Sequence, residues 1–513
     1  MKKLLLIYPP GDPDDSMNNV PPLGLLAISS YIKNNCKGIN APIYNFISNT
    51  FDEVESILSD VNPEQVLAVG ITVMSSYVSS ACQVAQIVRS VFHGVTIFAG
   101  GPHITLVGGQ FLTRHKEFDA LIIGDGEEPI AKLCMSILQN KPWQIEGVIE
   151  RTTNTTDSTN LQLLPPAQWT NPFNADLEYG FSIPLTYTDN NGVSHPATSL
   201  VTSRGCPLAC SFCSIRAMNS RYRTLPPRTV LGWLHEERKH NYFEHIYFLD
   251  ADFLVSKNRA LLWSNEIINT FGSNVTWSVQ ANVGHIISLG PKILKELRSS
   301  GLVLAEIGFE AGNDEQLKFF NKTNFGKLAN TNQSLIAIKL LKEAGIDIGI
   351  DYIMFYPEIS LINLAKNLNF LLQGNLVDCF DCGHYFNELI LFPGTPLRKY
   401  YEYKQGYAFD IDELPDVSKF YQDETVLQIR NIYLNWYKQI YIDKTLPTRR
   451  QLLNYCLQET NMSEKSILRL LEIKLRHQPY HILKNLITSG GDKQAAINIL
   501  EKDTILLNNY FKQ

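Results

Sequence analysis

The sequence predicts an α/β protein that consists of two β/α domains and a helical C-terminal region. Short apolar segments alternate with helical stretches over the first 140 residues, the alternation resumes near residue 195, and helical periodicity replaces it after residue 396. Such alternation is typical of parallel sheets, because each crossover helix covers a face of the sheet. We therefore divide the chain into a doubly wound domain (1–145), a linker (146–194), a partial (β/α)6 barrel of the TIM type (195–395) and a helical domain (396–513).

The composition excludes several classes of protein. With 513 residues, 44% hydrophobic and 19% charged, the chain is too long for one core and too apolar to be disordered. Its 45 Lys and Arg against 51 Asp and Glu give no basic surface for a nucleic acid. Nine cysteines spread over this length do not resemble a disulfide framework, so we expect reduced thiols and a cytoplasmic protein.

No apolar stretch reaches the roughly 18 residues that a membrane span requires. The apolar run at the start of the chain ends at Tyr8, which is too short for a signal peptide. We interpret it as a buried first strand of a soluble protein.

The first domain is expected to alternate five strands with four helices. The predicted strands are Lys3–Tyr8, Ala41–Phe46, Gln65–Val73, Val95–Ala99 and Ala120–Ile123. The predicted helices are Leu23–Lys33, Phe51–Leu58, Ser79–Val91 and Pro129–Gln139. Ligands of such sheets bind beyond the carboxyl ends of the strands.

Small and polar residues stand at these carboxyl ends. They are Pro9, Pro10 and Gly11; Ser75, Ser76 and Tyr77; Gly100, Gly101, Pro102 and His103; and Gly124, Asp125, Gly126, Glu127 and Glu128. Small residues let a large ligand approach the backbone. The alternative is that the glycines only form tight turns, which predicts no cofactor.

The linker is rich in Thr, Asn, Asp and Pro, and we expect it to be irregular. Six strands follow it: Ser199–Thr202, His245–Leu249, Thr276–Gln280, Leu304–Phe309, Ile346–Met354 and Tyr385–Leu391. Helices are expected near Val230–His240, Arg259–Phe271, Lys292–Ser300, Ser334–Ala344 and Leu361–Gln373. The active site of such a barrel lies at the carboxyl ends of its strands.

Three cysteines directly follow the first barrel strand. Cys206, Cys210 and Cys213 form a C-x3-C-x2-C motif, and three thiolates on one short loop favour a metal site. A cubane cluster held by three cysteines keeps one iron open for a substrate or cofactor, which implies catalysis. Two alternatives are a structural zinc ion completed by a distant histidine and three unrelated core cysteines.

This loop, with Phe212 before the third cysteine, resembles that of the radical S-adenosylmethionine (SAM) enzymes. The resemblance implies a 4Fe-4S cluster on the three cysteines, SAM on the fourth iron, and cleavage of SAM to a 5′-deoxyadenosyl radical. Strand ends of the barrel are similar to SAM-binding segments of that family, and the residues implied are Asp250, Asp252, Gln280 and Glu310. The alternative for the carboxylates is structural, since strand-end carboxylates often cap the next helix.

The resemblance extends to the cobalamin-dependent subgroup, in which a doubly wound domain precedes the barrel. It implies that the first domain is a Rossmann-like cobalamin-binding domain. The implied cobalamin contacts are Ser75, Ser76, Tyr77, Gly100, Gly101, Pro102, His103, Gly124, Gly126 and Glu127. No histidine lies in a D-x-H-x-x-G sequence, so the usual lower cobalt ligand is absent. His103 is a substitute ligand or, as we favour, a hydrogen-bonding loop residue.

The six other cysteines are interpreted as core residues. They are Cys36, Cys82, Cys134, Cys379, Cys382 and Cys456. Cys379 and Cys382 form a C-x2-C motif that could indicate a second cluster, but two cysteines alone do not make one. Small apolar side chains of this kind also pack at strand edges.

The resemblance implies an enzyme that methylates an unactivated carbon of a small-molecule, lipid or peptide substrate. Two alternatives stay open: a cobalamin-dependent radical SAM oxidoreductase, cyclase or rearranging enzyme without methyl transfer, and a non-catalytic cobalamin- or metal-binding module. The expected partners are that substrate and an external electron donor such as flavodoxin or ferredoxin. Neither a nucleic acid nor a membrane span is expected.

Overall fold

The computed structural model describes residues 1–11, 21–151, 169–180, 185–189, 193–218, 221–379, 384–441, 477–492 and 494. The chain divides into two compact units. The first comprises Met1–Gln280, Lys295–Val303 and Leu391–Pro415, and the second comprises Ala281–Leu294, Leu304–Ile390 and Asp416–Gln513. The first unit thus joins the N-terminal domain to the first strands of the barrel.

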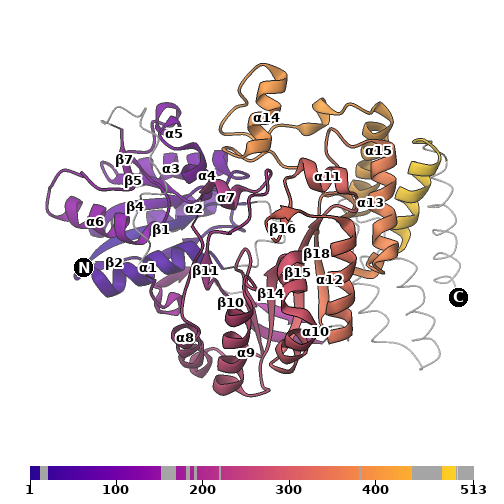
Figure 1. Cartoon of the computed structure of the whole chain (residues 1–513). Helices are drawn as coiled ribbons and strands as arrows, with labels where there is room; N and C mark the ends of the chain where they lie inside the picture. The colour runs from indigo at the N-terminus through magenta and orange to yellow at the C-terminus, as the bar shows by residue number, and fades with distance from the viewer. Residues whose placement is uncertain are drawn as a thin grey trace, which may run out of the picture. The chain divides into compact units, whose positions relative to one another are not determined.

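The N-terminal sheet has the predicted alternation (Figure 1). Its central strands run in the order β6-β5-β4-β1-β3 and are all parallel. Their bounds are β1 Lys2–Tyr8, β3 Ile43–Asn45, β4 Val66–Thr72, β5 Thr96–Gly100 and β6 Ala120–Ile122. The direction of winding reverses between β1 and β4, and ligands of open sheets bind at such a reversal.

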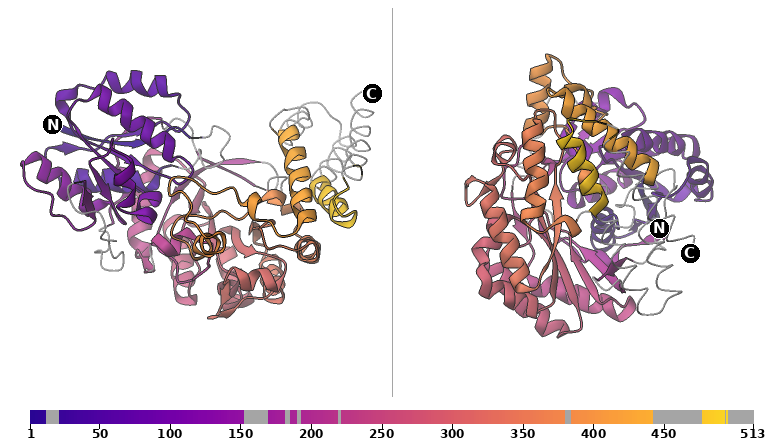
Figure 2. Two further views of the ribbon diagram at one scale, coloured as in Figure 1. Left: turned by 90° about the horizontal axis from the view of Figure 1, so that it is seen from above. Right: turned by 90° about the vertical axis from the view of Figure 1, so that its right-hand side faces the viewer.

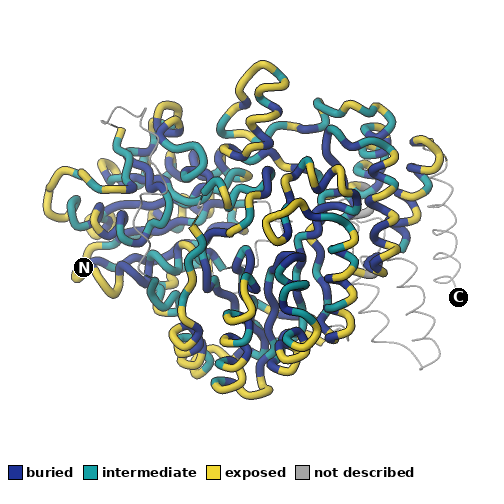
Figure 3. Tube along the Cα trace, in the orientation of Figure 1, coloured by how far each residue is buried: buried dark blue, intermediate teal, exposed yellow. Residues whose placement is uncertain are grey.

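Both faces of this sheet are covered by helices, as Figure 2 shows. The helices are α1 Leu23–Asn35, α2 Phe51–Ser59, α3 Val78–Val91 and α6 Glu127–Leu138. Leu5 and Ile7 of β1 pack into one core with α2 and α3, whereas Leu4 and Leu6 pack into the other with α1 and α6. Because neighbouring strand residues point to opposite faces, a strand covered on both sides must be continuously apolar. Figure 3 shows the strands buried beneath exposed helix surfaces.

The described part of the predicted linker adds edge strands to the sheets. β7 (Val148–Glu150) pairs antiparallel with β6, and β8 (Leu177–Tyr179) pairs parallel with β3. β9 (Thr186–Thr188) pairs antiparallel with the start of β10 (Ser194–Leu200). Residues without clear periodicity therefore form strands, because the exposed edges of existing sheets offer them backbone partners.

Within the first unit, the barrel begins with the parallel strands β10, β13 (His245–Phe248) and β14 (Thr276–Ala281). Helices α8 (Pro227–His240) and α9 (Lys257–Phe271) connect them. The two aromatic side chains Trp263 and Trp277 are fully buried between strand and helix layers. These elements follow the predicted order.

The second unit continues with β15 (Leu302–Glu310) paired parallel to β18 (Asp347–Tyr352). Helices α12 (Thr331–Ala344) and α13 (Leu361–Gln373) accompany them. The α/β half-barrel is therefore confirmed, but the sixth predicted strand, Tyr385–Leu391, does not form a regular strand. Its start forms the short 3-10 helix η5 (His384–Phe386), and Glu388 makes one parallel bridge with Phe355.

After the barrel the described residues are mainly helical, as predicted. They form α14 (Pro396–Gln405), α15 (Glu424–Tyr441) and a helix over 477–488. Thr395 caps α14 by accepting a hydrogen bond from the Arg398 backbone N–H, and Gly406 ends it in a left-handed conformation. Within the part of the chain that the structure describes, we find no helix with the length and apolar character needed to cross a bilayer.

Candidate functional site

The cysteine loop follows β10 and the two-residue strand β11 (Ser203–Arg204). Cys206 and Cys210 are buried, Cys213 is half-buried, and none of the three forms a disulfide. Helix α7 (Ser214–Met218) begins directly after the third cysteine. One short loop thus presents three thiols without a disulfide, which is a donor set that suits an iron–sulfur cluster with one open iron.

Asp250 holds the base of this loop. Its fully buried carboxylate accepts hydrogen bonds from the Thr202 backbone N–H at 3.0 Å, the Thr202 hydroxyl at 2.9 Å and the Ser203 hydroxyl. Arg259 Nη2 lies 3.5 Å from the carboxylate and donates to the Thr202 hydroxyl at 2.6 Å. Burial raises the pKa of the Asp250 carboxyl, while Ser203, Arg259 and Thr202 counteract that rise. Asp250 therefore positions the segment that leads into Cys206 rather than capping the next helix.

Replacement of Asp250 by asparagine is expected to destabilise the protein by about 2 kcal/mol, because the amide presents N–H donors where three donors already converge. The variant should also bind less iron per chain. Urea unfolding and iron analysis measure the two effects. The control is Asp314→Asn, whose exposed carboxylate accepts one backbone hydrogen bond from Thr331 and should cost less than about 1 kcal/mol. Equal losses in both variants would contradict a positioning role for Asp250.

Glu310 ends β15 in an unusual backbone conformation. Its φ of 65° is rare for a residue other than glycine, and such strain concentrates at functional sites. The buried carboxylate pairs with Lys322 Nζ at 2.7 Å. Burial raises the pKa of the Glu310 carboxyl and Lys322 acts against this. A Cβ on Gly308 would lie 2.6 Å from Glu310 Oε1, so glycine leaves room for the pair.

The other residues that the sequence suggests for SAM also lie at strand ends. Asp252 is 1% exposed, and its backbone carbonyl accepts a hydrogen bond from the Tyr222 hydroxyl at 3.4 Å. Gln280 lies near the end of β14, and its carbonyl accepts from the Phe253 N–H at 2.9 Å. Both residues belong, with the cysteine loop and Asp250, to the first unit, whereas Glu310 belongs to the second.

The residues suggested for cobalamin lie together at the carboxyl ends of β4, β5 and β6, because these three strands are parallel neighbours. We call this side of the N-terminal sheet its carboxyl-end edge. The Ser75 hydroxyl lies 3.1 Å from His103 Nδ1, and the Gly124 N–H donates to the Thr105 hydroxyl at 3.1 Å. Gly101 has a φ of 98°, and a Cβ there would lie 2.7 Å from Thr72 Oγ1. Gly101 is therefore required by its backbone conformation and by close packing, at the carboxyl ends of the strands where a cofactor would bind.

His103 is buried rather than presented at this edge. Its side chain is 1% exposed, and its ring packs edge-on against Phe111. Burial lowers the pKa of His103 to about 4, which keeps the imidazole neutral. Nδ1 contacts Ser75, and Nε2 lies 3.9 Å from Asp412 Oδ1. This geometry favours the hydrogen-bonding interpretation over a role as cobalt ligand.

Glu127 and its neighbour Asp125 connect the N-terminal domain to the cysteine loop. Arg204 stands two residues before Cys206. It donates a hydrogen bond to Asp125 at 2.9 Å, and both of its terminal nitrogens donate to the buried Glu127 carboxylate. Arg223 Nη1 pairs with the second oxygen of Asp125 at 2.5 Å. Residues from two predicted domains thus form one network of ion pairs.

A second connection passes through the turn after the barrel. Gly394, with a φ of 75°, lies against Leu106 of helix α4 (Pro102–Val107) and Ala217 of α7. The Leu397 N–H donates to the Ser211 carbonyl within the cysteine loop at 3.0 Å. Sequence reasoning singled out Asp125 but missed Arg204 and Arg223 as its partners. These pairs join residues that are 77 or more positions apart, so no local motif reveals them.

The remaining cysteines separate into two groups. Cys36, Cys82 and Cys134 are buried, as predicted for core residues. Cys379 is exposed in the 3-10 helix η4 (Val377–Cys379), so its assignment to the core is wrong. It lies in this short helix, before the segment that was predicted to be the sixth barrel strand, and does not pack at a strand edge as expected. Cys382 and Cys456 lie outside the described residues.

Comparisons with known proteins agree with both halves of this site. Residues 15–134 match the B12 binding domain, and residues 200–371 match the Radical SAM superfamily. The chain is 25% identical over 407 residues to "Uncharacterized methyltransferase PH0819" of Pyrococcus horikoshii, covering 78% of this chain and 83% of the relative. It is 24% identical over 337 residues to the anaerobic magnesium-protoporphyrin IX monomethyl ester cyclase of Rubrivivax gelatinosus, covering 64% of this chain and 58% of that enzyme.

A solved structure shares the fold. The cobalamin-dependent SAM radical enzyme OxsB, with aqua-cobalamin and SAM bound, matches 99% of this chain and 75% of its own with a TM-score of 0.66 and 16% identity. A radical SAM domain implies a 4Fe-4S cluster and SAM, and a B12 binding domain implies cobalamin. With both domains and a three-cysteine loop tied to the sheet edge of the first, the chain belongs to the cobalamin-dependent radical SAM enzymes.

Proposed function

We propose that this protein is a cobalamin-dependent radical SAM C-methyltransferase that acts on an unactivated carbon of a small-molecule, lipid or peptide substrate. The connection from Arg204 to Asp125 and Glu127 carries the proposal. It fixes the cysteine loop against the carboxyl-end edge of the B12 binding domain within one compact unit. Such a fixed arrangement suits a reaction in which both cofactors act on the same substrate carbon.

Within this proposal, Cys206, Cys210 and Cys213 hold the cluster, and Phe212, Asp252, Gln280 and Glu310 contact SAM. When bound, the cluster and SAM supply a 5′-deoxyadenosyl radical and cobalamin supplies the methyl group. The cobalamin contacts are Ser75, Ser76, Tyr77, Gly100, Gly101, Pro102, Gly124 and Gly126. His103 acts as a positioning residue, since its ring orients the Ser75 hydroxyl at the sheet edge.

The buried carboxylates of Glu127 and Asp250 have a structural role in this proposal. Glu127 is 2% exposed and both its oxygens face Arg204, so it joins the two cofactor domains rather than contacting the corrin. Asp250 positions the cysteine loop from the other side. Rigid support of this kind maintains the distance between the two cofactors.

The proposal predicts two products from SAM. Full-length protein assayed without oxygen, with reductant, SAM and hydroxocobalamin, should form both S-adenosylhomocysteine and 5′-deoxyadenosine, which chromatography with mass spectrometry measures. Omission of hydroxocobalamin should remove S-adenosylhomocysteine and leave 5′-deoxyadenosine, because only methyl transfer requires the corrin. Formation of 5′-deoxyadenosine alone in the complete assay would reject methyl transfer.

A second candidate is a cyclase or related oxidoreductase that uses the same cofactors. The 24% identity to the Rubrivivax gelatinosus cyclase favours it. This alternative requires 5′-deoxyadenosine without S-adenosylhomocysteine in the assay above. A non-catalytic metal-binding module would form neither product and would be colourless when purified without oxygen.

Reductive cleavage of SAM consumes one electron, so the proposed enzyme requires an external donor such as flavodoxin or ferredoxin. The chain carries a net charge of −6 and offers no overall positive field for an acidic donor. We therefore place donor recognition in local contacts near the cysteine loop, and propose the cytoplasm, where such donors are found, as the compartment.

A further inference from the structure

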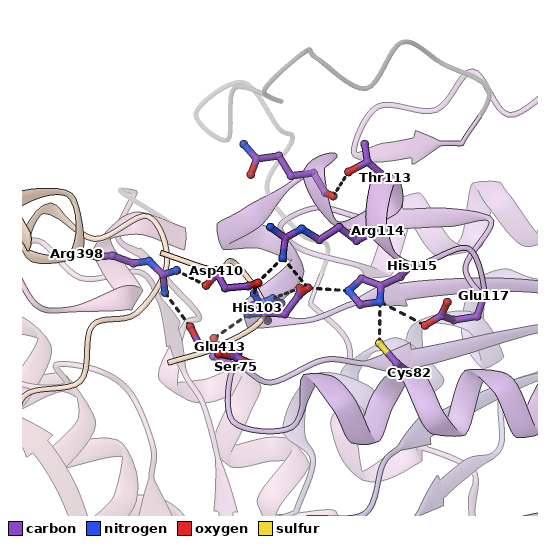
Figure 4. Close-up of polar contacts among 12 residues, drawn as sticks. Ser75, Cys82, His103, Thr113, Arg114, His115, Glu117, Arg398, Asp410 and Glu413 are labelled. Atoms are coloured by element: carbon purple, nitrogen blue, oxygen red, sulfur yellow. Dashed lines mark hydrogen bonds and ion pairs between the residues drawn. The ribbon is translucent and has the colours of Figure 1, made fainter. Parts of the chain in front are cut away.

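A second group of metal-ligating side chains lies in the B12 binding domain, away from the cysteine loop. Cys82 of α3, His115 at the end of helix α5 (Gln110–Arg114) and Glu117 in the next turn place one ligand atom each within 4.8 Å of the others. Figure 4 shows the Cys82 thiol and the Glu117 carboxylate beside the same ring nitrogen of His115. In the part of the chain that the structure describes, no other group of His, Cys, Asp and Glu is identified with this arrangement.

Two of the three distances between the ligand atoms fit a single tetrahedral ion, and all three atoms lie within 4.8 Å of one another. Bond lengths of about 2.3 Å for Zn–S and about 2.0–2.1 Å for Zn–N and Zn–O place sulfur about 3.5 Å from nitrogen and nitrogen about 3.3 Å from oxygen. Here Cys82 Sγ lies 3.2 Å from His115 Nδ1, and His115 Nδ1 lies 3.4 Å from Glu117 Oε1. The thiolate, imidazole and carboxylate are also the three ligand types that Zn²⁺ takes in proteins.

A second, independent feature orients the imidazole for metal binding. His115 Nε2 is buried and lies 3.1 Å from Asp412 Oδ2, an ion-pair contact whose geometry is not that of a hydrogen bond. Histidine ligands usually donate their remaining ring N–H to a carboxylate, which fixes the tautomer with the other nitrogen free to bind the ion. Asp412 lies on the Nε2 side of the ring, close enough to accept that N–H after a small rotation, and so leaves Nδ1, the atom near Cys82 and Glu117, for the ion.

The orienting carboxylate is itself held in place. Arg114 pairs with Asp412 at 3.2 Å and with the neighbouring Asp410. Arg398 of α14 donates to the Asp410 and Glu413 carbonyls, the latter at 3.2 Å. Contacts to Arg114 and Arg398 therefore hold the segment after α14, and Figure 4 shows Asp410 and Glu413 beside these two side chains.

We propose that Cys82, His115 and Glu117 bind one Zn²⁺ ion in the B12 binding domain, with Asp412 orienting the histidine. Binding replaces the thiol proton of Cys82, which leaves to solvent as the Zn–S bond forms. The three side chains occupy three positions of the tetrahedron, and a water molecule completes it. The ion would join α3 to the turn before β6, and Asp412 would extend this connection to the segment after α14.

The test uses full-length protein in which Cys206, Cys210 and Cys213 are all replaced by alanine, so that zinc cannot enter the cluster site. After removal of loosely held metal by gel filtration, elemental analysis should find about one zinc per chain. Adding Cys82→Ala or His115→Gln should lower this at least tenfold, whereas Cys36→Ala, a buried thiol on the opposite face of the sheet, should not. Far-UV circular dichroism establishes that each variant is folded.

X-ray absorption at the zinc edge provides a second measurement that does not depend on variants of the site. One sulfur and three lighter ligands per zinc are expected. Absence of zinc from the three-alanine protein, zinc that persists in folded His115→Gln, or more than one sulfur per zinc would each overturn the proposal. None of these results depends on methyl transfer, so the experiment tests the zinc site independently of the proposed function.

Discussion

Replacement of Cys210 by alanine is expected to abolish the iron–sulfur cluster and, with it, the cleavage of SAM. The buried thiol is one of only three that the loop offers, and a cubane with one open iron has no protein ligand to spare. Protein purified without oxygen should change from brown to colourless. Iron and sulfide should fall from about four of each per chain to a small residue, and 5′-deoxyadenosine should become undetectable.

The matched control is Cys36→Ala. Cys36 is 4% exposed in the core that covers one face of the N-terminal sheet. Its loss removes one sulfur atom from packed surroundings and should cost about 1 kcal/mol without affecting iron content. Full iron and sulfide in Cys210→Ala would show that the loop is not the cluster site. A colourless wild-type protein whose zinc content falls in Cys210→Ala would support the zinc alternative.

Replacement of Arg204 by methionine is expected to destabilise the first unit by about 3 kcal/mol, because it leaves the buried Glu127 carboxylate without its cation. Urea unfolding at pH 7 measures this loss. The control is Arg228→Met: Arg228 is 84% exposed and pairs with Glu266 on the surface, so its loss should cost less than about 1 kcal/mol. Similar costs for the two variants would contradict a supporting role for Arg204.

The effect of Arg204→Met should depend on pH. Burial acts to raise the pKa of Asp125, but the charge of Arg204 and the hydrogen bond from Arg223 outweigh it and lower that pKa. A depressed carboxyl pKa stabilises the fold above the unfolded value near 3.8, and this stabilisation is lost as the pH falls through the folded pKa. The difference between wild type and variant should therefore be largest at neutral pH and shrink below about pH 4.

A double variant separates the ion pair from simple packing. Arg204→Met combined with Glu127→Leu removes both charges and should recover part of the stability lost in Arg204→Met, since replacing a whole buried pair by apolar groups is often tolerated. It should not recover activity if the pair maintains the distance between the cofactors. Additive losses would show that Arg204 and Glu127 do not act on one another.

Much of the fold could be predicted because its signals are local. The continuous apolar run of β1 and the helical period of α3 each lie within one element, and each matches the structure to within one or two residues. The weakly patterned strands β7 and β8 could not be predicted, because they are held by pairing with β6 and β3 rather than by their own composition. The opposite error occurred near Tyr385, where an apolar segment forms a 3-10 helix and a single bridge.

The candidate site divides in the same way. The spacing of Cys206, Cys210 and Cys213 is a covalent property of one loop, so the sequence alone determined which side chains offer a metal site. The roles of Asp250, Glu127 and His103 depend on what faces them after folding. Asp250 faces Thr202 and Ser203, Glu127 faces Arg204, and His103 faces Ser75 from a buried position.

The sequence by itself therefore determined the order of the elements and the three-cysteine chemistry, since periodicity and spacing are written along the chain. Only the tertiary structure decided which charged and polar groups support that chemistry. Arg204 contacts Glu127, and His115 contacts Cys82 and Asp412. These residues are 33 to 297 positions apart in the sequence, so no local motif predicts the contacts. Partners of this kind are selected by the distance and burial that folding creates, because a buried charge is stable only where another group compensates it.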